Sequence, residues 1–345
     1  MRLALHRRRH RFRRPLTTAY AKLIDREVLL VEVTDGKGGR GLGEAAPLEP
    51  FDGVPLAAVA GELQALSQAL ADEPPPEDLE GVEELVGRIR RLGCGSHTAA
   101  ALSTALLDLI GKRRRLPLHR LLGAAGSRAI AVNAPIDAVD PHQAAALARE
   151  ATARGFSCLK VKVGVGDDIA RVQAIRKAAP RAAVRLDANG GWSETEAQEA
   201  LDRLEELEIE LCEEPVHGLR SIAALQRKVA MPLVADESAP VDPGEAVGIG
   251  GLCLRLGRCG GPLALLGAAR KALAAGMLTY IASTYDGPVG LAAALHVAAA
   301  LAEEGPLPPC GLATGELFAA FAEELLPRKG VIRPPSGPGL GLGGE

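Results

Sequence analysis

Charged side chains recur at the ends of short apolar runs in the second half of the chain. Lys160 and Lys162 lie in the run CLKVKVG, and the next three runs lead to Asp187, Glu213 and Asp236. Three converging carboxylates offer the oxygen ligands that a hard divalent cation prefers. A lysine beside such a cation can act as a general base, because nearby positive charge lowers its pKa. The pattern predicts a Mg²⁺ site, with Mn²⁺ as the alternative ion, that removes a proton α to a carboxylate through an enediolate.

Each single carboxylate has a second interpretation, as a cap on the helix that follows its strand. That interpretation would need a coincidence here, because acids follow three consecutive runs and two lysines precede them. The lysines are two residues apart and therefore share one face of a strand. Leu159, Val161 and Val163 alternate with them, so we expect the lysines to face the protein interior and not the solvent.

These residues belong to a repeating succession of runs and helical stretches that begins at residue 130. The runs are IAVNAPI, CLKVKVG, AVRLDAN, IELCEEP, PLVADES, GLCLRLG, MLTYIAS and a weaker CGLATG. Between them, helical patterns cover residues 141–154, 167–179, 193–207, 219–229, 262–275 and 289–303. This alternation predicts an α/β fold, a modified TIM barrel of seven to eight parallel strands. In such a barrel the active site forms at the C-terminal ends of the strands, where the charged residues lie.

The first part of the chain has a different rhythm, with a strand-like run at 26–33 and helical patterns at 55–70, 83–92 and 97–112. It begins MRLALHRRRHRFRRPL, a basic stretch that no apolar segment follows, so it is not a secretory signal. We interpret it as a solvated basic strand, with a transit peptide or a nucleic-acid arm as the alternative. The Gly- and Pro-rich tail after Arg328 is expected to return to this first part.

The composition excludes several classes of protein. A hydrophobic content of 47% and a net charge of -3 are unlike a disordered chain. The near-neutral charge, together with only five Phe, three Tyr and one Trp, disfavours nucleic-acid binding. The longest apolar stretch, 289–302, is shorter than the ~20 residues of a membrane helix. The six cysteines form no CxxC pair, which favours buried free thiols. We therefore expect a cytoplasmic protein without a nucleic-acid or membrane partner.

The motifs LKVKVG, RLDANGGW, CEEP and VADES resemble the enolase superfamily, in its muconate-lactonising subgroup. GLGEAAPLEPFDG at 41–53 resembles the capping domain of that subgroup, and the resemblance covers essentially the whole chain. It implies an α+β capping domain at 1–125, on which the tail 320–345 packs, and a catalytic barrel at 126–319. It also implies a small carboxylate substrate and a homo-oligomer.

Carried over by position, the resemblance makes Asp187, Glu213 and Asp236 the metal ligands. Lys162 becomes the base, with Lys160 as its neighbour. The remaining candidates would support the ligands or contact the substrate: Asn189, Tyr20, Glu237, Ser283, Thr284, Asp286 and Thr314. Tyr20 lies in PLTTAYAKL, which resembles the mobile loop that closes over the substrate.

The sixth run departs from the family pattern. Members of the family usually carry a lysine there, opposite the KxK pair, whereas LRLGRCGG places Arg255 at that position. Arginine is not deprotonated in proteins, so Arg255 is a poor second base for a racemase or epimerase. It suits a one-base reaction, as a fixed cation that stabilises an enolate or stacks on an aromatic ring.

The last run also departs from the dipeptide epimerases of the subgroup. Those enzymes show D-x-D there, whereas this chain has Gly311 and Ala313. GLATG, RPLTTA and STYDGPVG instead resemble o-succinylbenzoate synthases, in which one lysine suffices. The leading hypothesis is a lyase that dehydrates a cyclohexadiene carboxylate to o-succinylbenzoate in menaquinone biosynthesis. The alternatives are a muconate-type cycloisomerase, a dipeptide or N-acylamino acid racemase or epimerase, and a non-catalytic ligand-binding relative.

Overall fold

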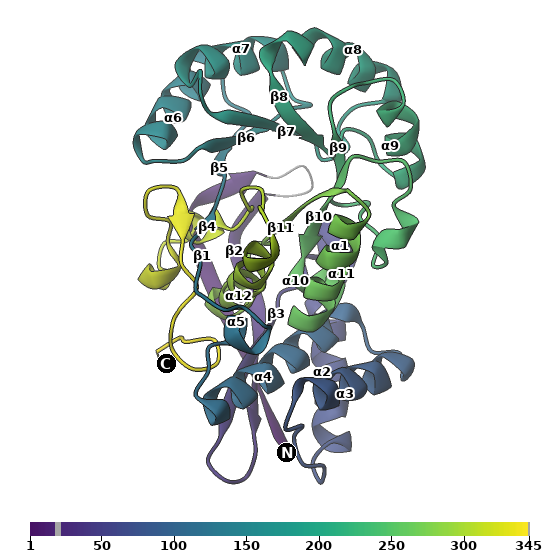
Figure 1. Ribbon diagram of the computed structural model, residues 1–345, viewed down its shortest axis with the longest axis vertical. Helices are drawn as coiled ribbons and strands as arrows, with labels where there is room; N and C mark the ends of the chain where they lie inside the picture. Colours follow the sequence, from purple (N-terminus) through teal and green to yellow (C-terminus); the bar gives the residue numbers. More distant parts are fainter. Residues whose placement is uncertain (18–21, 344–345) are drawn as a thin grey trace.

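Seven of the predicted runs form one curled parallel sheet, because each is short, apolar and followed by a helix. The computed structural model describes residues 1–17 and 22–343. Within them the strands follow one another around the sheet in chain order (Figure 1). They are β5 (Ala134–Ile136), β6 (Cys158–Lys162), β7 (Ala183–Asp187), β8 (Ile209–Glu213), β9 (Leu233–Ala235), β10 (Gly251–Arg255) and β11 (Leu278–Ala282).

The eighth run closes the ring as a short bridge. Cys310 N donates to Ala131 O (2.8 Å), and Gly311 N donates to Ile281 O (2.9 Å). Gly311 is required by this close approach, because a Cβ built on it would lie 2.8 Å from the Cβ of Ala282. The expected barrel of seven to eight strands is thereby confirmed.

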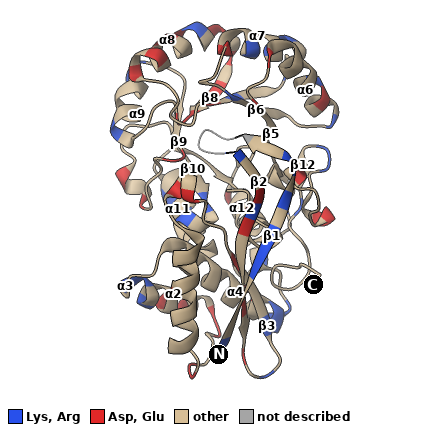
Figure 2. Cartoon of the chain, turned by 180° about the vertical axis from the view of Figure 1, so that it is seen from behind, with Lys and Arg blue, Asp and Glu red and all other residues tan. Residues whose placement is uncertain are grey.

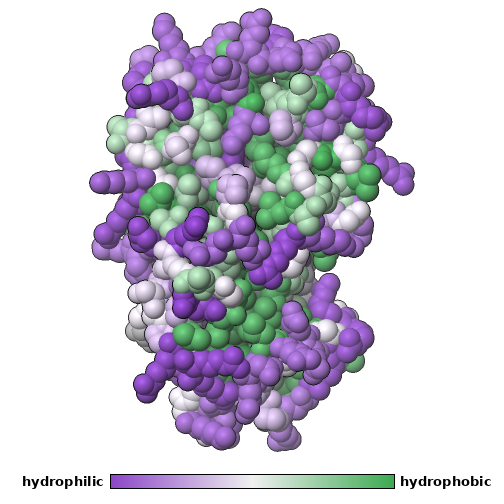
Figure 3. Space-filling model, in the orientation of Figure 1, coloured by the Kyte–Doolittle hydropathy of each residue, from purple (hydrophilic) through white to green (hydrophobic). Residues whose placement is uncertain are grey.

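The helices form an outer layer around the sheet (Figure 1). They are α6 (Pro141–Ala153), α7 (Asp168–Ala178), α8 (Glu194–Leu204) with the 3₁₀ turn η1 (Glu205–Leu207), α9 (Leu219–Gln226), α10 (Leu256–Cys259), α11 (Pro262–Ala274) and α12 (Pro288–Glu304). The short segment after β9 holds only the 3₁₀ turn η2 (Pro243–Glu245). On the face drawn in Figure 3, hydrophilic residues dominate the rim formed by the helices and hydrophobic ones gather toward the centre.

The capping side chains of these helices differ from the strand-end acids. Asp140, Asp167 and Ser193 cap α6, α7 and α8 through their side chains, and Ser193 forms a capping box with Glu196. The helix after β7 is therefore capped without Asp187.

The N-terminal region is a three-stranded antiparallel sheet covered by helices. Its strands are β1 (Arg2–Thr17), β2 (Lys22–Thr34) and β3 (Arg40–Ala45), and its helices are α1 (Glu49–Asp52), α2 (Leu56–Ala69), α3 (Leu79–Arg91), α4 (Ser96–Arg114) and α5 (Leu118–Leu121). Gly43 lets α4 lie on β3, because a Cβ there would stand 1.9 Å from Ala101 O. The basic N-terminus forms β1, an edge strand that Figure 2 shows rich in Lys and Arg.

The tail makes contacts with the N-terminal region. Its elements are η3 (Ala313–Leu317), η4 (Glu323–Leu325) and β12 (Val331–Ile332), which pairs with β4 (Ile130–Ala131). Beyond them, Leu118 N donates to Gly339 O and Leu340 N donates to Asp108 Oδ1, both at 2.7 Å. The domain limits at 125 and 319 stay predictions.

Two further expectations concern single features of the chain. All six cysteines are free; four are buried, and Cys94 and Cys259 are partly exposed. Among the described residues, no helix combines the length and the apolar character that crossing a membrane requires.

Candidate active site

Four predicted residues lie at the C-terminal mouth of the barrel on strands that end in register. Lys162 pairs with Asp187, and Asp187 pairs with Glu213, in the Cα register of β6, β7 and β8. Lys160 Nζ lies 2.7 Å from Glu213 Oε1 and 3.0 Å from Asp187 Oδ2. Glu213 is fully buried. The acids therefore face one another across a basic side chain inside the barrel.

Asp236 follows β9 and is held by the adjacent strand. Arg255 Nε donates to its Oδ1 at 2.7 Å, and Arg255 Nη2 contacts its Oδ2. The backbone of Asp236 is fixed as well, because its N–H donates to Glu214 Oε2 at 2.9 Å. The bidentate pair gives Arg255 a fixed orientation, as planar guanidinium–carboxylate pairs do.

The electrostatics of the cluster fit a divalent cation. When all three carboxyl groups are ionised, Lys160 and Arg255 leave one negative charge uncompensated. Burial, which Lys160 partly offsets, raises the pKa of Glu213 to about 8, and repulsion from the other two acids adds to the rise. Burial disfavours the Asp236 charge too, but Arg255 outweighs it and holds the pKa of Asp236 well below its usual range. Oxygen donors with surplus negative charge are what Mg²⁺ or Mn²⁺ binds.

The most compact set of possible metal ligands differs from the expected set of Asp187, Glu213 and Asp236. Ligand atoms of Glu213, Asp236 and Cys253 lie within 4.8 Å of one another. Asp187 stands outside this group and is joined to it through Lys160. Cys253 lies on β10, and its thiol is an unexpected neighbour of the two carboxylates.

The two lysines of β6 differ in their bonding. Lys160 is ion-paired with Asp187 and Glu213. In the described part of the chain, Lys162 Nζ makes no hydrogen bond or ion pair. Burial raises the pKa of Asp137, directly after β5, and the Lys162 charge partly offsets that rise. One lysine is therefore held in the cluster by two carboxylates, and the other is not.

Arg255 also touches the N-terminal region. The Phe51 ring lies 4.7 Å from the Cζ atom of Arg255 and 5.7 Å from that of Arg258. Phe51 belongs to α1, within the motif GLGEAAPLEPFDG. Two roles were expected for Arg255, stabilising an enolate or stacking on an aromatic ring; the structure places a ring of the chain itself, Phe51, against it.

Asn189 and Glu237 join two strand ends. Asn189 Nδ2 donates to Glu237 Oε1 at 2.8 Å, linking the loops after β7 and β9. Asn189 has φ 45°, Glu214 has φ 39° and Tyr285 has φ 55°. These three positive φ values all follow barrel strands at the mouth, and local backbone strain of this kind clusters at functional sites.

The candidates after β11 form the junction with the N-terminal region. Ser283 Oγ accepts from Asp286 N (2.9 Å), and Ser283 O accepts from Arg255 Nη1 (2.5 Å). Thr284 O accepts from Arg26 Nε (3.4 Å). These bonds position the loop, so contact of these side chains with a substrate stays a prediction.

Thr314 and Tyr20 are the two remaining candidates. Thr314 Oγ1 is buried and has no hydrogen-bond partner among the described residues. Tyr20 lies outside the described residues.

Sequence reasoning missed several neighbours of the cluster. Tyr280 Oη donates to Glu213 Oε2, and the Cys253 thiol lies beside Glu213 and Asp236. Tyr285 was not missed in this way, and it lies near Lys160 and Arg255. Burial of the Tyr285 hydroxyl raises its pKa to about 12. Alternation along β11 was the available signal for Tyr280, which lies on the inward face with Ala282. No local pattern pointed to Phe51.

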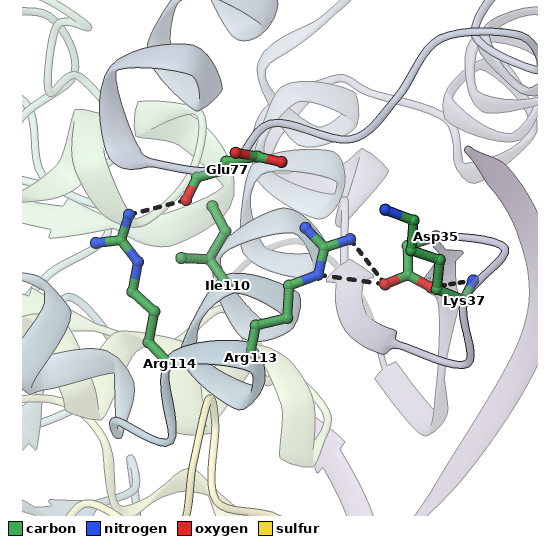
Figure 4. A pocket seen from close by; sticks show the side chains of 6 residues that line it. All are labelled: Asp35, Lys37, Glu77, Ile110, Arg113 and Arg114. Atoms are coloured by element: carbon green, nitrogen blue, oxygen red, sulfur yellow. Dashed lines mark hydrogen bonds and ion pairs between the residues drawn. The ribbon is translucent and has the colours of Figure 1, made fainter.

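A separate pocket of about 250 Å³ opens in the N-terminal region, away from the barrel (Figure 4). It is lined by Asp35, Lys37, Glu77, Ile110, Arg113 and Arg114. Arg113 Nη2 lies 2.7 Å from Asp35 Oδ2, and Arg114 Nη2 donates to Glu77 O at 2.8 Å. These arginines are already engaged within the pocket, so we do not consider it a candidate active site.

Comparison with known proteins agrees with this architecture. Residues 2–123 match the mandelate racemase / muconate lactonizing enzyme N-terminal domain, and residues 143–343 match the enolase C-terminal domain-like family. Muconate cycloisomerase 1 of Rhodococcus opacus is 33% identical over 356 residues, covering 95% of this chain and 91% of that protein. The o-succinylbenzoate synthase of Thermobifida fusca is 36% identical over 217 residues, covering 59% of this chain and 66% of that protein.

A solved structure is similar over the full length. The dipeptide epimerase of Enterococcus faecalis V583, complexed with Mg and the dipeptide L-Leu-L-Tyr, has a TM-score of 0.89 and 25% identity, and covers 99% of this chain and 98% of that chain. Because the two family matches together span most of the sequence and the fold agrees throughout, this protein is an isomerase or lyase of the enolase superfamily, in its muconate-lactonising subgroup.

Proposed function

We propose that the protein removes a proton α to the carboxylate of a small substrate with a single lysine, Lys162. The carrying observation is the contrast on β6, where Lys160 is ion-paired and Lys162 Nζ has no such bond within residues 1–17 and 22–343. Asp187, Glu213 and Asp236 would hold Mg²⁺, which supplies stabilisation of the negative charge that develops on the substrate carboxylate. The Mg bound in the E. faecalis epimerase supports this choice of ion.

Among one-base reactions, we propose the dehydration that yields o-succinylbenzoate. Lys162 accepts the α-proton and returns it to the departing hydroxyl, which leaves as water, so the lysine ends each turnover as it began. Arg255 lies four strands further around the sheet and is fixed by Asp236 and Ser283. There it supplies a permanent positive charge but no second base. The likeness to the T. fusca synthase supports this reaction.

An epimerase fits the site less well, despite the likeness in fold. Epimerisation needs a proton acceptor on each face of the α-carbon, and Arg255 stands where the second one would lie. An acid at position 311 is also disfavoured, because a side chain there would meet Ala282. A non-catalytic relative ranks lower still, because the acids and both lysines are all present.

A muconate-type cycloisomerase is the second candidate. It also needs only one lysine, and the likeness to the R. opacus enzyme extends over 95% of this chain. The assay below separates the two reactions, because their substrates and products differ.

The test supplies the full-length protein with Mg²⁺ and, in separate reactions, the cyclohexadiene carboxylate, a muconate and a dipeptide, all in D₂O. We expect o-succinylbenzoate and no racemised dipeptide. Lactone formation from muconate would favour the second candidate. Deuterium at the α-carbon of both dipeptide antipodes would overturn the one-base proposal.

We also infer that the protein works in the cytoplasm as a homo-oligomer, without a nucleic-acid or membrane partner. The free cysteines support a reducing compartment. Light scattering on the purified protein tests the oligomeric state, and a monomeric mass would contradict it.

A further inference from the structure

The thiol of Cys253 lies beside the carboxylate cluster. Cys253 is two residues before Arg255 on β10, so both side chains face the barrel interior. Its Sγ lies within 4.8 Å of ligand oxygens of Glu213 and Asp236, and the residue is 1% exposed. A cavity of about 10 Å³ borders Asp236, Cys253 and Arg255.

The other buried thiols behave differently. Cys158 Sγ donates to Glu210 Oε2 (3.9 Å), Cys212 Sγ to Glu213 O (4.0 Å) and Cys310 Sγ to Pro308 O (3.6 Å). Cys253 Sγ makes no hydrogen bond with the described residues. Among residues 1–17 and 22–343 it is therefore a buried polar group that faces two carboxylates and has no hydrogen-bond partner.

Sulfur changes which ions the group prefers. Mg²⁺ takes oxygen ligands and leaves a thiol uncoordinated, whereas thiolate selects softer ions. Two carboxylates, one sulfur and a water make a four-coordinate set of the kind Zn²⁺ accepts. Coordination need not break the bonds from Lys160, Tyr280 and Arg255, because each carboxylate oxygen has a second lone pair.

We propose that Cys253 gives this site a second metal-binding mode, in which Zn²⁺, Co²⁺ or Cd²⁺ is held by Glu213, Asp236 and the Cys253 sulfur. A metal–sulfur bond forms, the thiol proton passes to the solvent, and nothing is oxidised or reduced. The mode rests on the proposed function only in sharing two ligands with the proposed Mg²⁺ site. A soft ion bound through Cys253 therefore competes with Mg²⁺.

Cobalt reports sulfur ligation directly, without any assay of activity. The full-length protein, stripped of metal, is titrated with Co²⁺ while its near-ultraviolet absorption is recorded. We expect a sulfur-to-cobalt charge-transfer band that saturates at one ion per chain. Cys253→Ser should bind Co²⁺ without this band. Cys212→Ser is the matched control, because Cys212 is equally buried next to Glu213 on the opposite strand face, and it should retain the band.

A competition measurement gives the second readout. Cys253→Ser should weaken Zn²⁺ binding by about tenfold or more, as loss of a metal-site partner does, and change Mg²⁺ binding far less. A band that persists in Cys253→Ser, or Co²⁺ binding to the unmodified protein without the band, would overturn the proposal. If the protein shows the charge-transfer band but forms no o-succinylbenzoate, this inference stands and the proposed reaction fails.

Discussion

At the residue scale, Lys160 and Lys162 share a strand face but have different surroundings. The Lys160 ammonium lies between two carboxylates, whose charges raise its pKa well above the usual value despite burial. A lysine held in this way stays protonated and serves as a fixed charge. In the proposed reaction the proton therefore moves through Lys162, which is two residues further along β6.

Lys162→Ala should lower turnover by a factor of about 10² to 10⁴ or more, the range that general base catalysis supplies. The fold should persist, because Lys162 makes no hydrogen bond or ion pair within the described chain. Steady-state kinetics with the o-succinylbenzoate precursor measures the loss, and circular dichroism checks the fold. Lys177→Ala, on the exposed side of α7, is the control. Retained turnover in Lys162→Ala would remove this lysine as the base.

Arg255→Lys tests whether the arginine blocks proton exchange on the second face. Lysine cannot form the bidentate pair with Asp236 and can lose its proton. We expect slower dehydration together with newly acquired exchange of a substrate α-hydrogen with D₂O, followed by mass spectrometry. An unchanged rate of dehydration, with no exchange of the α-hydrogen, would show that Arg255 neither supports dehydration nor blocks exchange.

At the element scale, local periodicity was sufficient for the barrel but not for its whole site. The alternation of runs and helical stretches predicted β5 to β11 and the helices between them, because strand and helix periods are local properties. Successive strand ends likewise predicted that Asp187, Glu213 and Asp236 converge; Glu213 and Asp236 lie together, and Lys160 joins Asp187 to Glu213. Phe51 lies on an element far away in the sequence, and its contact with Arg255 depends on how two regions dock. The spacing of residues along the chain does not predict how the two regions dock.

The bridge at residues 310–311 offers a test of barrel closure. Gly311→Ala adds a methyl group 2.8 Å from Ala282 Cβ and should cost about 1–3 kcal/mol of unfolding free energy, as overpacking does. Urea denaturation measures it. Gly267→Ala is the matched substitution on α11, where a Cβ meets nothing within 4 Å, and should stabilise by about 0.5–1 kcal/mol. Equal effects of the two would mean that the eighth run is not tightly packed.

At the scale of the whole molecule, two buried ionisable side chains join the N-terminal region to the barrel. Glu44 on β3 accepts from Gly287 N (2.7 Å), and Arg26 on β2 donates to Ala46 O (2.5 Å), Pro47 O (2.8 Å) and Thr284 O (3.4 Å). Burial, with repulsion from Asp286, raises the pKa of Glu44 to about 8. The junction therefore contains a carboxyl group that holds its proton near neutral pH.

This proton makes stability depend on pH. The folded protein keeps it up to about pH 8, whereas the unfolded chain loses it near the ordinary value of 4.5. Folded molecules thus bind more protons in this window, and the Glu44 contribution to stability falls as pH rises from about 5 to 8. Glu44→Gln should flatten that decline in urea denaturation, and Glu84→Gln, on the exposed surface of α3, should not. Parallel curves for Glu44→Gln and the unmodified protein would contradict the assignment.

The edge strand β1 has a consequence for self-association. Arg7, Arg8 and Arg9 are exposed along this edge, and β2 is the strand with which they pair. A second copy that added itself antiparallel at this edge would set arginine against arginine, a repulsion that proteins use to prevent sheets from growing across molecules. Exposed arginines along β1 therefore disfavour the pairing of two copies through this edge.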